Sequence, residues 1–353
     1  MRPFGREDAM HIDPSTFDEA VATSSFTGVV TVDVGDRRTL ERCEGYRQRA
    51  LGAPMVVDAR IAIASGSKAF TALAVMRLVE DGALRLDQPV RDLLGGDLPL
   101  IDDAVTIEHL LTHTSGIGDY LDEDADWEVS DYVLTLPSHT LTTAVAFLPM
   151  LEGHEQKYAP GERFSYCNGG YMVLAVLIER VTGETYHDVV RRLVFTPAGL
   201  GATDFLPLNE LPVDAAQGYV HDEGDLVNTL HLPVLGNGDG GAFTTAADLH
   251  RFWLAFLGGR IVSPGSVEEM TRPRHDVPEE DLRAGMGFFL HRTGPALVLE
   301  GYDAGASFRS THIIGTRTTV SVLGNSSEGA WPVIGVLAGA IDAELAPGPT
   351  PGA

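Results

Sequence analysis

The chain has 353 residues, of which 44% are hydrophobic, and a formal net charge of −25 at pH 7. This length and hydrophobic content suffice for one large core or two closely packed domains. A surface this negative repels phosphate backbones and anionic lipid, so the composition argues against nucleic acid and membranes as partners.

The chain ends and the cysteines indicate a compartment. The first residues, MRPFGREDAMHIDPSTF, contain no apolar segment before the first charges, so we expect no secretory signal. The apolar run Trp331–Ile341 is too short to cross a bilayer and predicts a buried helix. Only Cys43 and Cys167 are present, which favours reduced thiols over a disulfide framework. Together these features predict a cytoplasmic protein.

The N-terminal quarter predicts a short helix over residues 14–23, capped by Asp13 or Ser15, and then a β-hairpin. The hairpin consists of Phe26–Val34 and Arg38–Tyr46 around Gly35-Asp36. The segment Arg60–Ala64 then leads into Ser65. A helix is predicted over Ser67–Asp81 and stops at Gly82.

The middle of the chain, from about residue 86 to 235, predicts mainly helices and loops. The expected helices are Val105–Leu111, Thr143–Leu151, Asn168–Val181 and Glu184–Phe195, followed by Thr245–Leu257 and a helix that opens at Ser263-Pro264. The end predicts strands over Gly287–Arg292, Ala296–Glu300, Ser307–Ile314 and Thr318–Leu323, then a terminal helix.

Strands at both ends of the chain enclose helices in the middle, which predicts an α+β fold. We expect one antiparallel sheet of N- and C-terminal strands flanked by helices. The sheet domain would comprise residues 1–85 and 240–345, and a mainly helical inserted domain residues 86–239. A flexible Pro/Gly tail would occupy residues 346–353.

Ser65-Gly66-Ser67-Lys68 has the S-x-x-K form. In the first helical turn, residues three apart share a face, so Lys68 can reach the Ser65 hydroxyl and take its proton. The chain contains 23 Arg and only two Lys, so a retained lysine favours a role that needs deprotonation, which Arg cannot provide. By itself the pattern favours a capping serine followed by a solvent-facing lysine.

Tyr166-Cys167-Asn168 stands just before a predicted helix. A tyrosine hydroxyl beside a lysine can join a proton relay, and an asparagine can hydrogen-bond both that lysine and an acyl carbonyl. Alone, the pattern favours a loop tyrosine packed on the domain interface, with the asparagine as helix N-cap.

Together these motifs make the chain resemble the group of class C β-lactamases, D-alanyl-D-alanine peptidases, penicillin-binding proteins and family VIII esterases. Matching segments follow in the family's order: Phe70-Thr-Ala-Leu-Ala, Gly82-Ala-Leu-Arg-Leu-Asp-x-Pro-Val90, Leu110-Leu-Thr-His-Thr-Ser-Gly116, Phe195-x-Pro-x-Gly-Leu200 and Gly240-Gly-Ala-Phe-Thr-Thr-Ala-Ala-Asp-Leu249. The resemblance covers nearly all of residues 26–325. It implies the β-lactamase/transpeptidase-like fold, with Ser65 as nucleophile and Lys68 and Tyr166 as proton carriers.

The third box of that family departs from its pattern. Relatives carry Lys-Thr-Gly or His-x-Gly on a strand beside the site, where the box binds a substrate carboxylate. The corresponding stretch here is Glu300–Phe308, and we expect Tyr302 in place of the cation, with Asp303 beside it. The resemblance implies an oxyanion hole from the backbone amides of Ser65 and of a residue near Gly305 or Ala306, with Asn168 as a further substrate contact.

Other candidates are weaker. His113 belongs to a loop that the resemblance makes structural, and Cys167 is expected to pack. The twelve His residues show no H-E-x-x-H or paired Cys/His spacing, which argues against a metal, and a G-x-S-x-G elbow is absent.

The sequence thus predicts a cofactor-free serine hydrolase or acyltransferase that acts on a small ester or amide through a Ser65 acyl-enzyme. A β-lactamase or D-amino-acid peptidase uses the same residues, and a catalytically silent binding module with this fold is an alternative of another class. The acyl group, its acceptor and the oligomeric state stay open.

Overall fold

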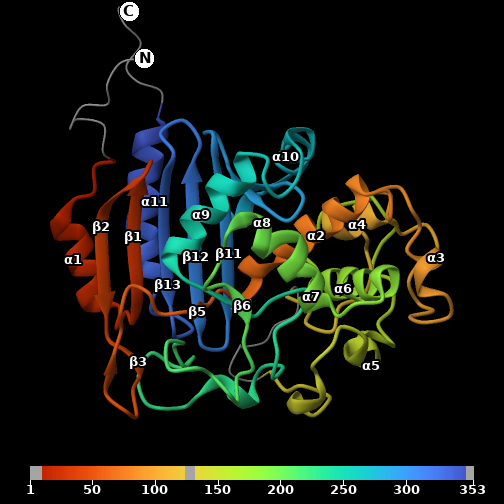
Figure 1. Cartoon of the computed structure of the whole chain (residues 1–353), viewed down its shortest axis with the longest axis horizontal. Helices are drawn as coiled ribbons and strands as arrows, with labels where there is room; N and C mark the ends of the chain where they lie inside the picture. Colours follow the sequence, from red (N-terminus) through yellow and green to blue (C-terminus); the bar gives the residue numbers. More distant parts are fainter. Residues whose placement is uncertain (1–9, 124–131, 347–353) are drawn as a thin grey trace, which may run out of the picture.

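The computed structural model describes residues 10–123 and 132–346. Its main sheet contains β1 (Gly28–Val34), β2 (Arg37–Glu44), β8 (His275–Val277), β9 (Leu282–Ala284), β10 (Phe289–His291), β11 (Ala296–Asp303), β12 (Ala306–Ile313) and β13 (Thr318–Gly324). Within the described residues these eight strands lie antiparallel in the order β2-β1-β13-β12-β11-β10-β9-β8 (Figure 1). The predicted α+β class and the sheet of N- and C-terminal strands are confirmed.

Some of the helices lie against this sheet, and others form the part of the molecule at the right of Figure 1. The helices are α1 (Pro14–Thr23), α2 (Lys68–Glu80), α3 (Arg91–Leu94), α4 (Ile107–Leu111), α5 (Leu148–Leu151), α6 (Asn168–Thr182), α7 (Tyr186–Val190), α8 (Thr196–Ala198), α9 (Ala246–Leu257), α10 (Pro264–Met270) and α11 (Trp331–Leu345). The 3-10 turn η1 (Ala64–Ser67) directly precedes α2, and a small sheet joins β5 (Ile61–Ala62), β7 (Ala242–Thr244) and β6 (Asp204–Phe205).

The two faces of the main sheet are buried against different helices. Side chains alternate along a strand, so Val30 and Val32 of β1 pack in a cluster with residues of α1 and α11. Val29, the residue before Val30, faces the other way and belongs to the larger core on the opposite face. Because both faces are covered, six of the seven residues of β1 are buried.

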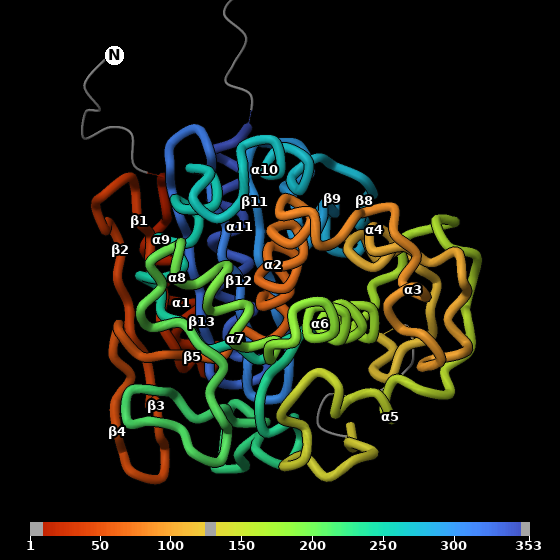
Figure 2. Tube along the Cα trace, turned by 45° about the vertical axis from the view of Figure 1, so that its right-hand side comes forward, coloured from red at the N-terminus to blue at the C-terminus, as the bar shows by residue number. Residues whose placement is uncertain are grey.

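The larger core is continuous from the sheet into the helical region. It includes Leu299 of β11 and Phe308 of β12, together with Leu73 of α2 and Ile178 of α6. Helices α2 and α6 pack against each other at this junction (Figure 2). The division at residues 86 and 239 stays a prediction, and the tail predicted after Ala346 lies outside the described residues.

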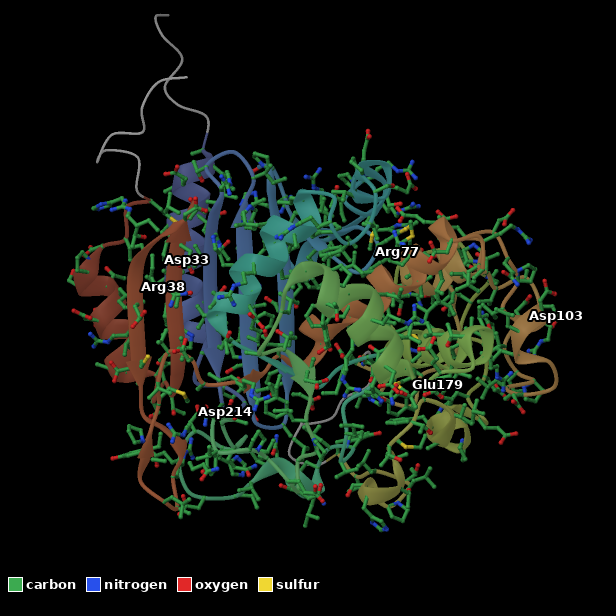
Figure 3. All side chains as sticks on the ribbon, viewed as in Figure 1. Asp33, Arg38, Arg77, Asp103, Glu179 and Asp214 are labelled. Carbon is green, nitrogen blue, oxygen red and sulfur yellow. The ribbon has the colours of Figure 1, made fainter. Side chains whose placement is uncertain are left out.

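Helix α6 is fixed from its far end as well. The carboxylate of Glu179 (Figure 3) accepts hydrogen bonds from the backbone N–H groups of Ala144, Val145 and Tyr186, at 3.1, 3.1 and 3.0 Å. These bonds tie α6 to the segments before α5 and α7.

The structure differs from the predicted elements in ways that matter for the site. Strand β11 extends to Asp303, three residues beyond the predicted end at Glu300, and β8 and β9 were not predicted. The extension pairs Tyr302 with Ser307 and Asp303 with Ala306, so it brings the third-box segment into the sheet.

Candidate active site

Ser65 lies in η1, at the start of α2, with its side chain half-buried. The residue before it, Ala64, has a φ of 43°, in the left-handed region that non-glycine residues rarely adopt. Ser67 holds this turn in place, because its Oγ donates to Ala64 O at 2.8 Å and accepts from Ala242 N at 2.9 Å. The turn is therefore braced against β7 and presents Ser65 in a fixed direction.

Lys68 is 4% exposed, and its ammonium nitrogen has three close acceptors. Nζ lies 2.9 Å from Ser65 Oγ, 2.7 Å from Asn168 Oδ1 and 2.6 Å from the backbone O of Asp239. A neutral amine can donate its two protons to the amide and carbonyl oxygens and direct its lone pair at the Ser65 hydroxyl. This arrangement suits proton transfer from Ser65 to Lys68.

Burial lowers the pKa of Lys68, since the interior disfavours its charged form. The nearby carboxylates of Asp239, Glu123, Asp119 and Asp303 oppose this shift. The direction that burial gives is the one a general base needs.

Tyr166 lies over the same lysine, with Nζ 4.9 Å from its ring centroid. Burial raises its pKa well above the usual value, although a hydrogen bond with the Ser65 side chain opposes the shift. Its phenol is thus held in the protonated form and can act as a proton donor. The ring of His113 stacks on Tyr166 with 4.5 Å between centroids.

His113 itself is 6% exposed, and its contacts do not suit a role as general base. Its Nδ1 accepts a hydrogen bond from Cys167 N at 3.0 Å, and burial lowers its pKa to about 3. The neutral ring also stacks on Tyr171, at 4.9 Å between centroids.

The Cys167 Sγ accepts from Gly170 N at 3.3 Å and so caps α6, while burial raises the pKa of its thiol.

Asn168 is 2% exposed and joins the lysine to a loop that the sequence analysis did not single out. Its Nδ2 donates to Leu121 O at 3.1 Å and to Glu123 Oε1 at 2.8 Å. Its backbone N donates to Asp119 Oδ2 at 2.6 Å. These contacts orient the amide so that Oδ1 faces Lys68.

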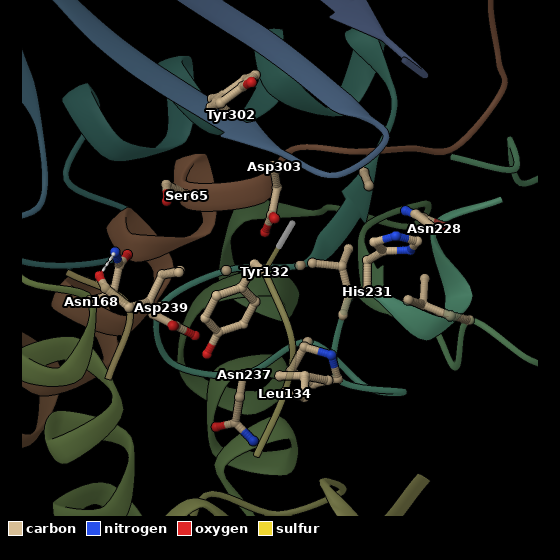
Figure 4. A pocket seen from close by; sticks show the side chains of 18 of the residues that line it. Ser65, Tyr132, Leu134, Asn168, Asn228, His231, Asn237, Asp239, Tyr302 and Asp303 are labelled. Atoms are coloured by element: carbon tan, nitrogen blue, oxygen red, sulfur yellow. Dashed lines mark hydrogen bonds between the residues drawn. The ribbon is translucent and has the colours of Figure 1, made fainter. Parts of the chain in front are cut away.

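A cavity of about 360 Å³ opens beside Ser65 (Figure 4). Three carboxylates, of Glu123, Asp239 and Asp303, line it, and the described residues of its wall include no Arg or Lys. The remaining wall is largely apolar or aromatic, and consists of residues such as Leu121, Tyr132, Leu134, Leu208, Leu232 and Phe243. The cavity thus combines an apolar wall with negative charge.

Strand β11 makes its closest approach to the serine turn at Gly301. A Cβ added there would lie 2.2 Å from Ile63 O and 2.9 Å from Ser65 N, so only glycine fits. Successive side chains alternate across the strand, and Asp303 projects toward the cavity whereas Tyr302 projects away (Figure 4). The Tyr302 hydroxyl donates to Glu328, and its side chain is 40% exposed.

The turn after this strand holds the two residues that were expected to contribute to the oxyanion hole. The N–H of Gly305 donates to Ser327 Oγ at 2.9 Å, so this amide is already engaged. Ala306 begins β12, paired with Asp303. Neither Gly305 nor Ala306 is among the residues that line the cavities beside Ser65.

The described residues contain neither a metal-binding cluster nor a membrane-spanning helix. They contain no group of three or more His, Cys, Asp or Glu side chains arranged to hold a metal ion. No helix in the described ranges combines the length and apolar character needed to cross a bilayer. Cys43 and Cys167 are free thiols.

Comparison with known proteins places these observations in a family. Residues 15–336 match the family model described as Beta-lactamase. The chain is 30% identical over 321 residues to penicillin-binding protein 4* of Bacillus subtilis (strain 168), which covers 86% of this chain and 69% of that protein. It is 26% identical to a D-aminopeptidase of Brucella anthropi, covering 90% and 60%, and 32% identical to esterase EstB of Burkholderia gladioli, covering 54% and 50%.

Among solved structures, a penicillin-binding protein from Bacillus halodurans superposes with a TM-score of 0.84 and 32% identity. The match covers 92% of this chain and 99% of that one. The chain thus spans between half and about seven-tenths of the three curated relatives, but nearly the whole of this solved chain.

Proposed function

Because this chain belongs to the beta-lactamase family and is a serine hydrolase, we propose that it cleaves small esters or amides through an acyl-enzyme on Ser65. The observation that carries the proposal is the contact of Lys68 Nζ with Ser65 Oγ and Asn168 Oδ1, at 2.9 and 2.7 Å. Nucleophile, base and orienting amide are therefore assembled before a substrate arrives.

In the proposed first step, Ser65 Oγ attacks the substrate carbonyl carbon while Lys68 Nζ takes the hydroxyl proton. The new C–O bond gives a tetrahedral intermediate with a negative oxygen. Tyr166 then donates its phenolic proton to the leaving oxygen or nitrogen as that bond breaks, and Lys68 returns a proton to Tyr166. Water or another nucleophile releases the acyl group by the same transfers in reverse.

The backbone N–H groups of Ser65 and Tyr302 are the proposed donors to the negative oxygen. Asp303 and Ala306 close a two-residue turn as a hydrogen-bonded pair, so the next pair, Tyr302 and Ser307, does not exchange hydrogen bonds. The Tyr302 N–H therefore points away from β12. Strand β10 begins at Phe289, opposite Val298, so its pairing does not reach Tyr302 and this edge of β11 is open beside Ser65.

The third box is proposed to be Leu299-Glu300-Gly301, three residues earlier than the sequence suggested. Its glycine is the residue that has to lack a Cβ next to Ser65, and Gly301 meets that condition. Leu299, which is 2% exposed, then occupies the position of the family's cation. Glu300 follows it and is paired with Arg309, so this arginine is committed. The box still lacks a free cation.

The charge of the cavity supports a preference for neutral or positively charged substrates. In this cavity, whose described lining contains no Arg or Lys, a substrate carboxylate would meet Glu123, Asp239 and Asp303. A substrate ammonium group would be attracted to the same carboxylates. A preference for positively charged substrates agrees better with an activity like that of the D-aminopeptidase relative than with a β-lactamase activity. Hydrolysis of nitrocefin would distinguish the two activities.

Asp303→Asn is expected to lower kcat/KM for an ammonium-bearing ester by about ten- to a hundredfold. One charge-assisted hydrogen bond contributes roughly 1.5–3 kcal/mol, which corresponds to that range. The variant should change kcat/KM for the isosteric neutral ester less than about threefold. Equal losses on both esters would show that Asp303 is needed for turnover and not for selecting charge.

The same pair of esters gives a pH test. Burial, followed by repulsion from Asp239, raises the pKa of Asp303 to about 7, while Lys68 lowers it. As the pH falls through about 7, Asp303 takes up a proton and loses its charge, so KM for the ammonium ester should rise toward that of the neutral ester. In Asp303→Asn this convergence should be largely absent.

A further inference from the structure

Asp119 lies in the loop between α4 and α5, outside every motif of the proposed reaction. Asp119 is 7% exposed and forms no ion pair with an Arg or Lys among the described residues. Instead, both of its oxygens face backbone N–H groups. Oδ2 accepts from Asn168 N at 2.6 Å, and Oδ1 accepts from Gly169 N at 2.7 Å and Leu121 N at 3.2 Å.

These bonds join two segments that are far apart in sequence. Asn168 and Gly169 are the first residues of α6, and their N–H groups have no carbonyl partner within the helix. Leu121 belongs to the loop that carries Asp119 itself. A single carboxylate therefore clamps this loop onto the first turn of α6.

The clamped loop supplies both acceptors of the Asn168 side-chain N–H₂ group, Leu121 O and Glu123 Oε1. Because both of its donors are used on that side, the Asn168 amide presents its oxygen to Lys68 Nζ. A displaced loop would let the amide turn or withdraw. The lysine would then lose one of the two acceptors, Asn168 Oδ1 and Asp239 O, that hold it beside Ser65.

We propose that Asp119 is a positioning residue, which acts through Asn168 to hold Lys68 in reach of the Ser65 hydroxyl. The proposal rests on the function proposed above, since it concerns the same proton transfer. The carboxylate is required because the groups that face it, three backbone N–H groups and the Cys167 thiol, are donors. An asparagine would bring only one acceptor oxygen and would turn an N–H₂ group toward an N–H.

Asp119→Asn is the test, with the full-length chain and a neutral ester as substrate. We expect kcat to fall about ten- to a hundredfold with KM changed less than threefold, because misplacing a catalytic group by about 1 Å can cost about a hundredfold in rate. The rate at which a fluorophosphonate labels Ser65 should fall by a similar factor.

Asp248→Asn is the matched control. Asp248 is also a buried carboxylate, at 0% exposure, and accepts hydrogen bonds from Ala202 N at 2.8 Å and Thr203 Oγ1 at 2.9 Å. It does not line the cavities beside Ser65. This variant should lower the melting temperature but leave kcat within twofold of the wild type.

Gly169→Ala covers the case in which Asp119→Asn does not fold. Its new Cβ would lie 3.0 Å from Asp119 Oδ1, so it crowds the clamp without removing charge, and kcat should fall about three- to tenfold. The inference is overturned if the folded Asp119→Asn variant, or Gly169→Ala in its place, keeps wild-type kcat and labelling rate. Failure of the wild-type enzyme to label at Ser65 would instead overturn the proposed function.

Discussion

Replacing Ser65 with alanine is expected to lower kcat for ester hydrolysis by about 10⁴-fold or more while the protein stays folded. The variant lacks the atom that forms the acyl-enzyme, and removing a catalytic serine alone costs about as much as removing a whole triad. The fold loses only the hydrogen bond with Lys68 and that with Tyr166, of which each contributes about 1 kcal/mol.

The measurement is turnover of a small ester, together with thermal unfolding of each variant. Ser310→Ala is a suitable control, because Ser310 is a fully buried serine on β12 that accepts from Trp253 Nε1 at 3.0 Å and does not line the cavities beside Ser65. It should lose stability but retain turnover. Substantial activity in a folded Ser65→Ala protein would rule out Ser65 as the nucleophile.

Lys68→Arg should be nearly as damaging as Lys68→Ala, with a loss in kcat of about 10³-fold. Arginine keeps the positive charge and adds donors for Asn168 and Asp239, but it does not give up its proton at any working pH. A general base at this position is therefore lost in both variants, while a fixed charge is lost only in the alanine variant.

The chain offers a matched control in its other lysine. Lys157 pairs with Asp122 at 2.6 Å, an interaction that arginine can reproduce, so Lys157→Arg should keep wild-type kcat. If Lys68→Arg likewise retains most of its kcat, then Lys68 serves as a fixed charge and the proposed base is wrong.

The order of the elements could be predicted from the sequence because it depends on local patterns. Apolar periodicity indicated α2, α6 and α9, and strand composition indicated the long strands β1, β11, β12 and β13, within a few residues of their bounds. The S-x-x-K and Tyr-x-Asn spacings indicated Ser65, Lys68, Tyr166 and Asn168. Their contacts in the structure agree with the proposed roles, which stay predictions.

The parts that were not predicted depend on tertiary contacts. Asp119, Glu123 and the backbone of Asp239 reach the site from loops, and no spacing distinguishes them among the 50 acidic residues of the chain. The third box is proposed at a different register because a sequence does not show which glycine passes Ser65. Only the Cβ distance at Gly301 indicates that register.

The central claim is that Ser65 forms a covalent bond with the substrate's acyl group, and intact-mass spectrometry after exposure to a fluorophosphonate tests it most directly. The wild-type protein should gain the mass of one phosphonyl adduct, located by peptide mapping to the segment that contains Ser65. Ser65→Ala should gain none under the same conditions, while Ser310→Ala should label like the wild type. An adduct on another residue, or equal labelling of Ser65→Ala, would contradict the account.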